Sequence, residues 1–154
     1  MYKASVITVS DKTFTGERED TSGEYITNYL KEKDFEIVSY GIIPETDEII
    51  RRNLIKCCDV YKVDLLIAIG ITRETFGRIF EDKVLGLNEV IKDIDMKILN
   101  KETSIGVRCE TLLVNITNYK ENYESDFDGI VNFLKEEIVR ISLEKRVFKR
   151  ASDY

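Results

Sequence analysis

The run Leu65-Leu66-Ile67-Ala68-Ile69, closed by Gly70, is apolar at every position. A strand with apolar side chains on both faces belongs in the middle of a parallel sheet that helices cover on both sides. The run Leu112-Leu113-Val114-Asn115 has the same character, and Lys3 to Val9 alternates before it becomes apolar. These three runs predict parallel strands with nearly inaccessible side chains. The side chains expected to be buried are Val6, Ile7, Val9, Leu65, Leu66, Ile67, Ile69, Leu113 and Val114.

Patterns typical of helices alternate with these strands along the chain. Thr21 and Glu24 have the spacing of a capping box that opens a helix. Thr46 precedes two acidic residues and predicts the start of a second helix. Phe35 to Ile43 predicts a strand between them, and the apolar stripe from Phe127 to Ile141 predicts a long closing helix. This alternation predicts an α/β fold, a three-layer α/β/α sandwich around a mostly parallel sheet.

The composition limits the classes of function. The chain has 154 residues, which is enough for one domain with a core that needs no disulfide or metal. It contains no histidine, which excludes a Ser-His-Asp triad, an imidazole base and the usual zinc sites. Its 23 basic and 29 acidic side chains give a net charge of −6, which argues against a nucleic-acid partner. No apolar run approaches the roughly 20 residues of a membrane helix, so we expect no membrane partner.

The cysteines bear on the cellular compartment. Cys57, Cys58 and Cys109 are odd in number and lack CxxC spacing, so we expect all three to pack in the core. Free thiols suit a reducing, cytoplasmic location. Because the chain shows no linker or repeat, we expect a single domain over residues 1–143 and a basic C-terminal tail over residues 144–154.

Four turns follow the predicted strands at the edge where open α/β sheets bind ligands. They are Ser10-Asp11, Pro44-Glu45-Thr46-Asp47, Gly70-Ile71-Thr72-Arg73 and Asn115-Ile116-Thr117-Asn118. Each combines small or hydroxyl side chains with a polar or charged one, and helix starts nearby can present N–H groups to an anion. We expect these turns to surround one cleft, although such residues also occur at the turns of any α/β domain.

At these turns the chain resembles a known family. The segments that carry the resemblance are Val6-Ile7-Thr8-Val9-Ser10-Asp11, Gly16-Glu17, Asp20-Thr21-Ser22-Gly23, Ile43-Pro44-Glu45, Leu65 to Gly70, Gly106-Val107-Arg108 and Thr111-Leu112-Leu113-Val114-Asn115. They are similar to motifs of the molybdopterin-binding (MoaB/Mog) proteins of molybdenum-cofactor biosynthesis, which read T-V-S-D, G-x-x-x-D-x-S-G, V-P-D and G-I-R-x-x-T-L-I-V-N. The resemblance extends over most of the chain.

The resemblance implies a homotrimer that adenylylates molybdopterin with ATP and Mg²⁺. It also implies roles for individual residues. Glu45 and Asp82 match the acidic catalytic positions, and the matches to ligand-binding positions are Asp11, Ser22, Gly70, Thr72, Asn115 and Asn118. Of these, Glu45 replaces an aspartate and keeps the carboxylate one methylene farther out.

Two departures from the family motifs bear on catalysis. Gly70-Ile71-Thr72-Arg73 stands where the family has G-G-T-G, and Arg78 replaces the aspartate of R-D-V-T-P. Arginine cannot hold Mg²⁺ but can bind an oxyanion, so we expect Arg73 and Arg78 to clamp a phosphate, unless they are solvated surface charges. We therefore expect no metal-ligating residue in the site, binding that depends weakly on Mg²⁺, and slow or absent adenylyl transfer.

Three functions remain open on the sequence. The first is an enzyme of molybdenum-cofactor biosynthesis that acts on molybdopterin. The second is a non-catalytic protein that binds molybdopterin or a nucleotide in the same pocket. The third is an α/β interaction module that retains only the inherited fold.

Overall fold

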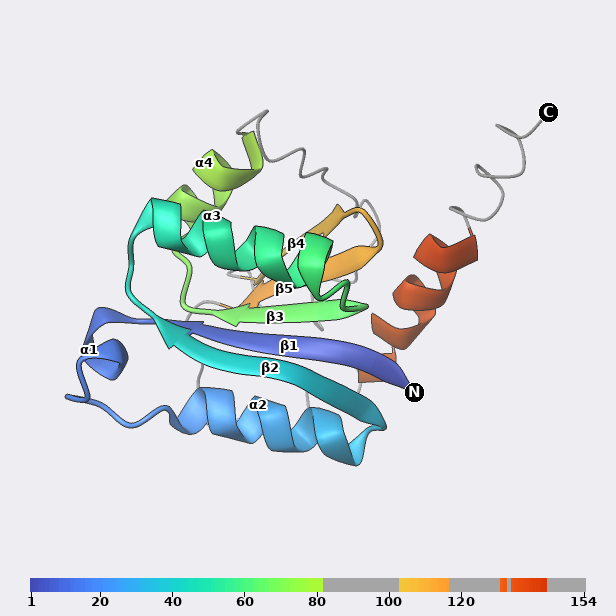
Figure 1. Ribbon diagram of the computed structural model, residues 1–154, viewed down its shortest axis with the longest axis horizontal. Helices are drawn as coiled ribbons and strands as arrows, with labels where there is room; N and C mark the ends of the chain where they lie inside the picture. Colours follow the sequence, from blue (N-terminus) through green and yellow to red (C-terminus); the bar gives the residue numbers. More distant parts are fainter. Residues whose placement is uncertain (82–102, 117–130, 133, 144–154) are drawn as a thin grey trace.

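The computed structural model describes residues 1–81, 103–116, 131–132 and 134–143 (Figure 1). Five strands and four α-helices follow the order β1(Tyr2–Val9), α1(Asp11–Phe14), α2(Thr21–Glu32), β2(Phe35–Ile43), α3(Asp47–Ile55), β3(Leu65–Ile69), α4(Arg73–Glu81), β4(Thr103–Arg108) and β5(Thr111–Ile116). A π-helical segment, Lys56–Val60, extends α3, and the described residues from 131 to 143 form a further helix. None of the described helices is long and apolar enough to cross a membrane.

The five strands form one sheet in the order β2-β1-β3-β5-β4. Strand β1 is parallel to β2 on one side and to β3 on the other, and β3 is parallel to β5. Strand β4 is antiparallel to β5 and was not predicted from the sequence. The predicted mostly parallel sheet is confirmed.

Helices cover both faces of the sheet, which confirms the three-layer sandwich (Figure 1). On one face, α2 and the helix at 131–143 contribute Leu30 and Leu134 to a cluster with Ile67. On the other face, α3 and α4 contribute residues such as Leu54 to a second cluster. The nine side chains predicted to be buried are between 0% and 7% exposed. Burial of apolar strands on both faces is therefore the main source of this arrangement.

The start of α2 differs from the sequence prediction. The prediction of a capping box formed by Thr21 and Glu24 is wrong. Asp20 is the N-cap residue, and its carboxylate accepts a hydrogen bond from the Gly23 N–H at 3.1 Å. The aspartate therefore performs the capping that the sequence analysis assigned to the neighbouring threonine. Thr46 is the N-cap residue of α3 as predicted, but its side chain makes no cap hydrogen bond.

The cysteines confirm the core prediction in part. Cys57 and Cys58 are buried beside α3, whereas Cys109 is exposed, which corrects the expectation that all three pack in the core. Cys109 occupies the turn between β4 and β5 with a φ of 55°, and this turn lies at the surface. The predicted tail, residues 144–154, lies outside the described residues.

Candidate functional site

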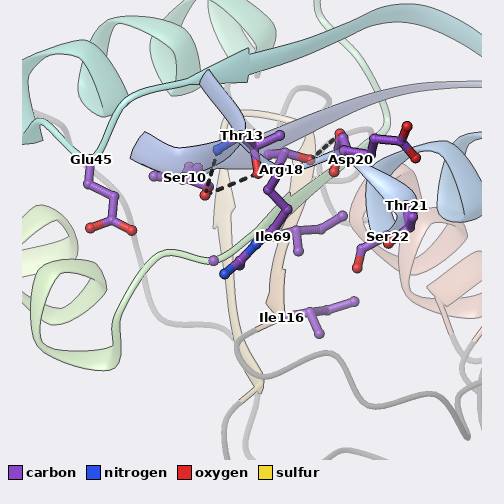
Figure 2. A pocket seen from close by; sticks show the side chains of 13 residues that line it. Ser10, Thr13, Arg18, Asp20, Thr21, Ser22, Glu45, Ile69 and Ile116 are labelled. Atoms are coloured by element: carbon purple, nitrogen blue, oxygen red, sulfur yellow. Dashed lines mark hydrogen bonds between the residues drawn. The ribbon is translucent and has the colours of Figure 1, made fainter. Parts of the chain in front are cut away.

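A cavity of about 400 Å³ lies where β1 and β3 end (Figure 2). The chain passes from β1 to β2 on one side and to β3 on the other, so the strand order reverses between β1 and β3. Open α/β sheets place their ligands at this kind of switch point, outside the carboxyl ends of the strands. The residues that line the cavity are Thr8, Val9, Ser10, Thr13, Arg18, Glu19, Asp20, Thr21, Ser22, Glu45, Ile69, Gly70 and Ile116.

Gly70 follows β3 directly and lines the cavity. Its φ is +100°, and a Cβ added there would lie 2.5 Å from the carbonyl oxygen of Val9 on β1. Its N–H donates to the carbonyl oxygen of Ile116 at 2.9 Å, which holds the ends of β3 and β5 together. Only glycine combines this backbone conformation with such a close approach of the two strands.

Asn115 holds the turn after Gly70 through hydrogen bonds to its backbone and is not among the residues that line the cavity. Its side chain is fully buried, its Oδ1 accepts from the N–H of Ile71 at 3.2 Å, and its Nδ2 donates to the Ile71 carbonyl at 2.9 Å. Ile71 occupies the position of the second family glycine, is not among the described residues with positive φ, and is 1% exposed. The isoleucine therefore fits this turn because its side chain packs into the core.

Two hydroxyl residues and an aspartate organise the end of β1. Ser10 caps α1, and its Oγ accepts hydrogen bonds from the Thr13 N–H at 3.3 Å and from the Thr13 hydroxyl at 3.1 Å. The Oδ1 of Asp11 accepts from the N–H of Glu45 at 2.9 Å. Asp11 thus connects the end of β1 to the turn before α3, and Glu45 of this turn lines the cavity.

Asp20 connects three elements at the opposite end of the cavity. Its carboxylate accepts hydrogen bonds from the Thr8 hydroxyl at 2.8 Å, from the Gly23 N–H at 3.1 Å and from the Tyr40 hydroxyl. Burial and then the hydrogen bond to Asp20 raise the pKa of Tyr40. A Cβ at Gly23 would lie 2.1 Å from Oδ2 of Asp20, so this arrangement needs the glycine. These bonds fix the start of α2 against β1 and β2.

The charges that line the cavity are unequally divided. Among the described residues the lining includes one cation, Arg18, and the carboxylates of Glu19, Asp20 and Glu45. In Figure 2 the Arg18 side chain extends across the cavity, with Glu45 at one end and Ser22 at the other. The sequence analysis missed Arg18. Its only signal was its place two residues before the helix-capping aspartate.

The two arginines predicted to clamp phosphate belong to α4. Arg78 bonds to the carboxylates of Asp47 at 3.3 Å and Glu74 at 3.2 Å, and to the hydroxyl of Thr75 at 3.0 Å. It does not line the cavity. The side chain of Arg73 lies outside what the structure describes.

The other predicted site residues divide into three groups. Ser22, Glu45 and Gly70 line the cavity. Asp11 and Asn115 hold its turns in place, and Thr72 accepts a hydrogen bond from the N–H of Thr75 at 3.1 Å at the start of α4. The remaining two, Asp82 and Asn118, lie outside the described residues.

The described residues contain no preformed cluster of metal ligands. Within residues 1–81, 103–116 and the described helix from 131 to 143, no group of three or more acidic or cysteine residues is arranged to hold a metal ion. The carboxylate of Asp20 already accepts three hydrogen bonds. Because Mg²⁺ at phosphate-transfer sites is held by one or two carboxylates together with substrate phosphates, Glu45 of the lining would hold it only with a phosphate ligand present.

Comparisons with known proteins identify relatives of this chain. A family model described as "Probable molybdopterin binding domain" matches residues 5–118. Molybdopterin adenylyltransferases from two Helicobacter pylori strains, J99 and 26695, are each 29% identical over 126 residues and cover 72% of this chain and 71% of the relative.

Solved structures agree on the fold. The molybdopterin biosynthesis enzyme MoaB from Thermus thermophilus has a TM-score of 0.70 at 21% identity and covers 92% of this chain and 96% of its own. The molybdopterin biosynthesis Mog protein from Mycobacterium ulcerans has a TM-score of 0.70 at 20% identity and covers 92% and 99%. Because the family match includes the strands that end at the cavity and most of the chain, the protein belongs to the molybdopterin-binding domain family of molybdenum-cofactor biosynthesis, as a divergent MoaB/Mog member.

Proposed function

We propose that this protein binds molybdopterin and ATP at the cavity between the ends of β1 and β3, and that it transfers the adenylyl group slowly. The observation that carries the proposal is the place of the cavity at the switch point of the sheet, within the matched family region. Its volume of about 400 Å³ falls in the range of small-molecule sites, roughly 300–1,000 Å³. The adenylyltransferase relatives supply the identity of the two ligands.

The lining offers groups that bind and orient phosphates. Helix α2 begins at the cavity, and the positive end of its dipole favours an anionic group near Ser22. The hydroxyl groups of Ser10 and Thr21 also line the cavity and can donate to phosphate oxygens. The apolar side chains of Ile69 and Ile116 also line the cavity and offer a surface for a planar ring (Figure 2).

In the proposed reaction, a phosphate oxygen of molybdopterin attacks the α-phosphorus of ATP. The bond from this phosphorus to the bridging oxygen breaks, and pyrophosphate leaves. Such transfers depend on positioning and on stabilising the negative charge that gathers on the phosphate oxygens. Mg²⁺ bound together with the ligand phosphates would supply part of this stabilisation. The slow rate is our inference from Arg78, which stands where the family motif has an aspartate.

A second candidate is a non-catalytic protein that binds the same ligands. Its support is Arg78, which stands where the family motif has an aspartate and which is held by Asp47 and Glu74. The two candidates share the ligands and differ only in turnover.

We also propose, from the resemblance to MoaB/Mog proteins, that the protein is a cytoplasmic homotrimer with small-molecule partners only. Sedimentation velocity of the purified protein tests the assembly. A single species of three chains supports it, and a monomer contradicts it.

The test of function separates binding from turnover. Equilibrium titrations with molybdopterin and with ATP, under anaerobic conditions and with or without Mg²⁺, measure binding. A parallel incubation with both ligands measures adenylylated molybdopterin and pyrophosphate. Binding with slow product formation supports the proposal, and binding without product supports the non-catalytic candidate. A protein that binds neither ligand contradicts both.

A further inference from the structure

Within the described residues, Arg18 is a cation of the cavity that has no protein partner. Its side chain forms no hydrogen bond, ion pair or ring contact with the part of the chain that the structure describes. This contrasts with Arg78, Arg108 and Arg52, each of which is paired with a carboxylate. An unpaired guanidinium that lines a cavity has its five N–H donors available for a ligand.

The backbone of Arg18 is fixed even though its side chain is not. Its N–H donates to the carbonyl oxygen of Lys12 at 3.2 Å, which ties the turn back to α1. Gly16, with a φ of +86°, lets the chain reverse there. Two residues later, Asp20 anchors the chain to β1, β2 and α2. The guanidinium is therefore attached to a turn that is held at both ends.

The charge of the cavity makes this cation important for an anionic ligand. Glu19, Asp20 and Glu45 also belong to the lining, so the described lining residues carry more negative than positive charge. A phosphate that enters meets one cation among the described lining residues, Arg18, and the positive end of the α2 dipole. Figure 2 places the guanidinium in the middle of the cavity, between Glu45 and the start of α2.

We propose that Arg18 binds a phosphate group of the ligand and so supplies the positive charge that the sequence analysis assigned to Arg73 and Arg78. This inference rests on the proposed function, and it names one residue of the phosphate subsite. The phosphate belongs either to the nucleotide or to the pterin, and a guanidinium binds both through paired N–H···O bonds.

The test compares three variants with the unmodified protein. Arg18→Gln removes the charge, Arg18→Lys keeps the charge but loses the forked donors, and Lys12→Gln is the matched control. Lys12 carries the same charge on the neighbouring α1 and is exposed, but it does not line the cavity. The dissociation constants of ATP, AMP, adenosine, pyrophosphate and molybdopterin are measured in EDTA, and thermal unfolding checks that each variant folds.

We expect Arg18→Gln to weaken the binding of at least one phosphate ligand by about 10-fold to 100-fold. Arg18→Lys should recover part of this loss, adenosine should bind equally to all proteins, and Lys12→Gln should change each constant less than about 2-fold. A loss confined to ATP, AMP and pyrophosphate assigns the subsite to the nucleotide, and a loss confined to molybdopterin assigns it to the pterin phosphate.

The outcomes separate this inference from the proposed function. If the unmodified protein binds ATP and molybdopterin and Arg18→Gln binds both equally well, the role of Arg18 is overturned and the proposed function stands. An equal loss in Lys12→Gln also overturns it, because the effect is then one of general charge. If the unmodified protein binds none of the phosphate ligands, both proposals are overturned.

Discussion

The carboxylate of Asp11 accepts a hydrogen bond from the N–H of Glu45 at 2.9 Å, although the two residues are 34 positions apart in the sequence. This bond joins the turn after β1 to the turn after β2, and these strands are parallel neighbours. It determines where the chain at Glu45 lies relative to the cavity.

Replacement of Asp11 by alanine should therefore disturb the position of Glu45. The bond is exposed, so we expect a loss of about 0.5–1 kcal/mol in the free energy of unfolding. Asp11→Asn keeps an acceptor oxygen and should lose less. Urea denaturation measures the difference, and equal stabilities of Asp11→Ala and the unmodified protein would show that the bond contributes nothing.

The second prediction concerns Gly70. Alanine at this position must adopt a φ of +100° and place its Cβ 2.5 Å from the Val9 carbonyl oxygen, so Gly70→Ala should lower the free energy of unfolding by more than about 2 kcal/mol. Gly77→Ala is the control, because Gly77 lies in α4 with nothing within 4 Å of an added Cβ. That variant should gain about 0.5–1 kcal/mol. Both values come from denaturant titrations, and a Gly70→Ala protein as stable as the Gly77→Ala protein would refute the close approach of β1 and β3.

The third prediction concerns pH. The pKa of Tyr40 is raised in the folded protein by burial and by its hydrogen bond to Asp20. Because the folded state holds the phenol proton more tightly, the stabilisation is fully present below the ordinary tyrosine pKa of about 10. It should be lost as the pH rises through the higher, folded-state pKa. Stability should therefore fall at alkaline pH.

The Tyr40→Phe variant tests this dependence. It should be about 1 kcal/mol less stable than the unmodified protein at pH 8, because Asp20 loses one donor. Above pH 10 the difference in the free energy of unfolding between the two proteins should become smaller. Denaturation curves from pH 8 to pH 11 measure this, and a difference that stays constant would contradict the role of the phenol proton.

The fourth prediction concerns Arg78. Arg78→Asp places a third carboxylate beside Asp47 and Glu74, which the arginine now neutralises. Such a cluster attracts a divalent cation, so the variant should bind ATP more tightly with Mg²⁺ than without, by a larger factor than the unmodified protein. Arg78→Gln breaks the same ion pairs without adding a carboxylate and is the control. Titrations with ATP in the presence of Mg²⁺ and in EDTA give, for each protein, the factor by which Mg²⁺ tightens ATP binding. Identical factors for the Asp and Gln variants would exclude a metal role for this position.

The sequence predicted the parts of the fold that depend on apolar patterning. The runs at 65–69 and 112–115 are buried strands because their side chains are apolar on both faces. Strand β4 was missed because Thr103–Arg108 mixes polar and apolar residues and, among the described strands, pairs with β5 alone. Its strand conformation depends on pairing with β5, and the local sequence pattern does not indicate this pairing.

The site was less predictable than the fold. Gly70 could be recognised because its position at the end of an apolar strand is a local feature. The roles of Arg18 and Arg78 could not be told apart from the sequence, since Arg18 lies in a run of acidic residues and Arg78 lies within a helical pattern, and neither pattern reports a tertiary partner. Their difference is tertiary: Asp47 of α3 lies within reach of Arg78, while the described residues offer Arg18 no partner.

The most direct test of the cavity as the ligand site is an NMR titration of the isotopically labelled protein with molybdopterin and with ATP. We predict that the backbone amide signals of Ser10, Ser22 and Gly70, which line the cavity, shift progressively with each ligand. The signals of Cys109 and Glu110, in the β4–β5 turn at the amino ends of the parallel strands, should stay unchanged. Saturable shifts confined to the β4–β5 turn, or no shifts at all with either ligand, would contradict the assignment of the site.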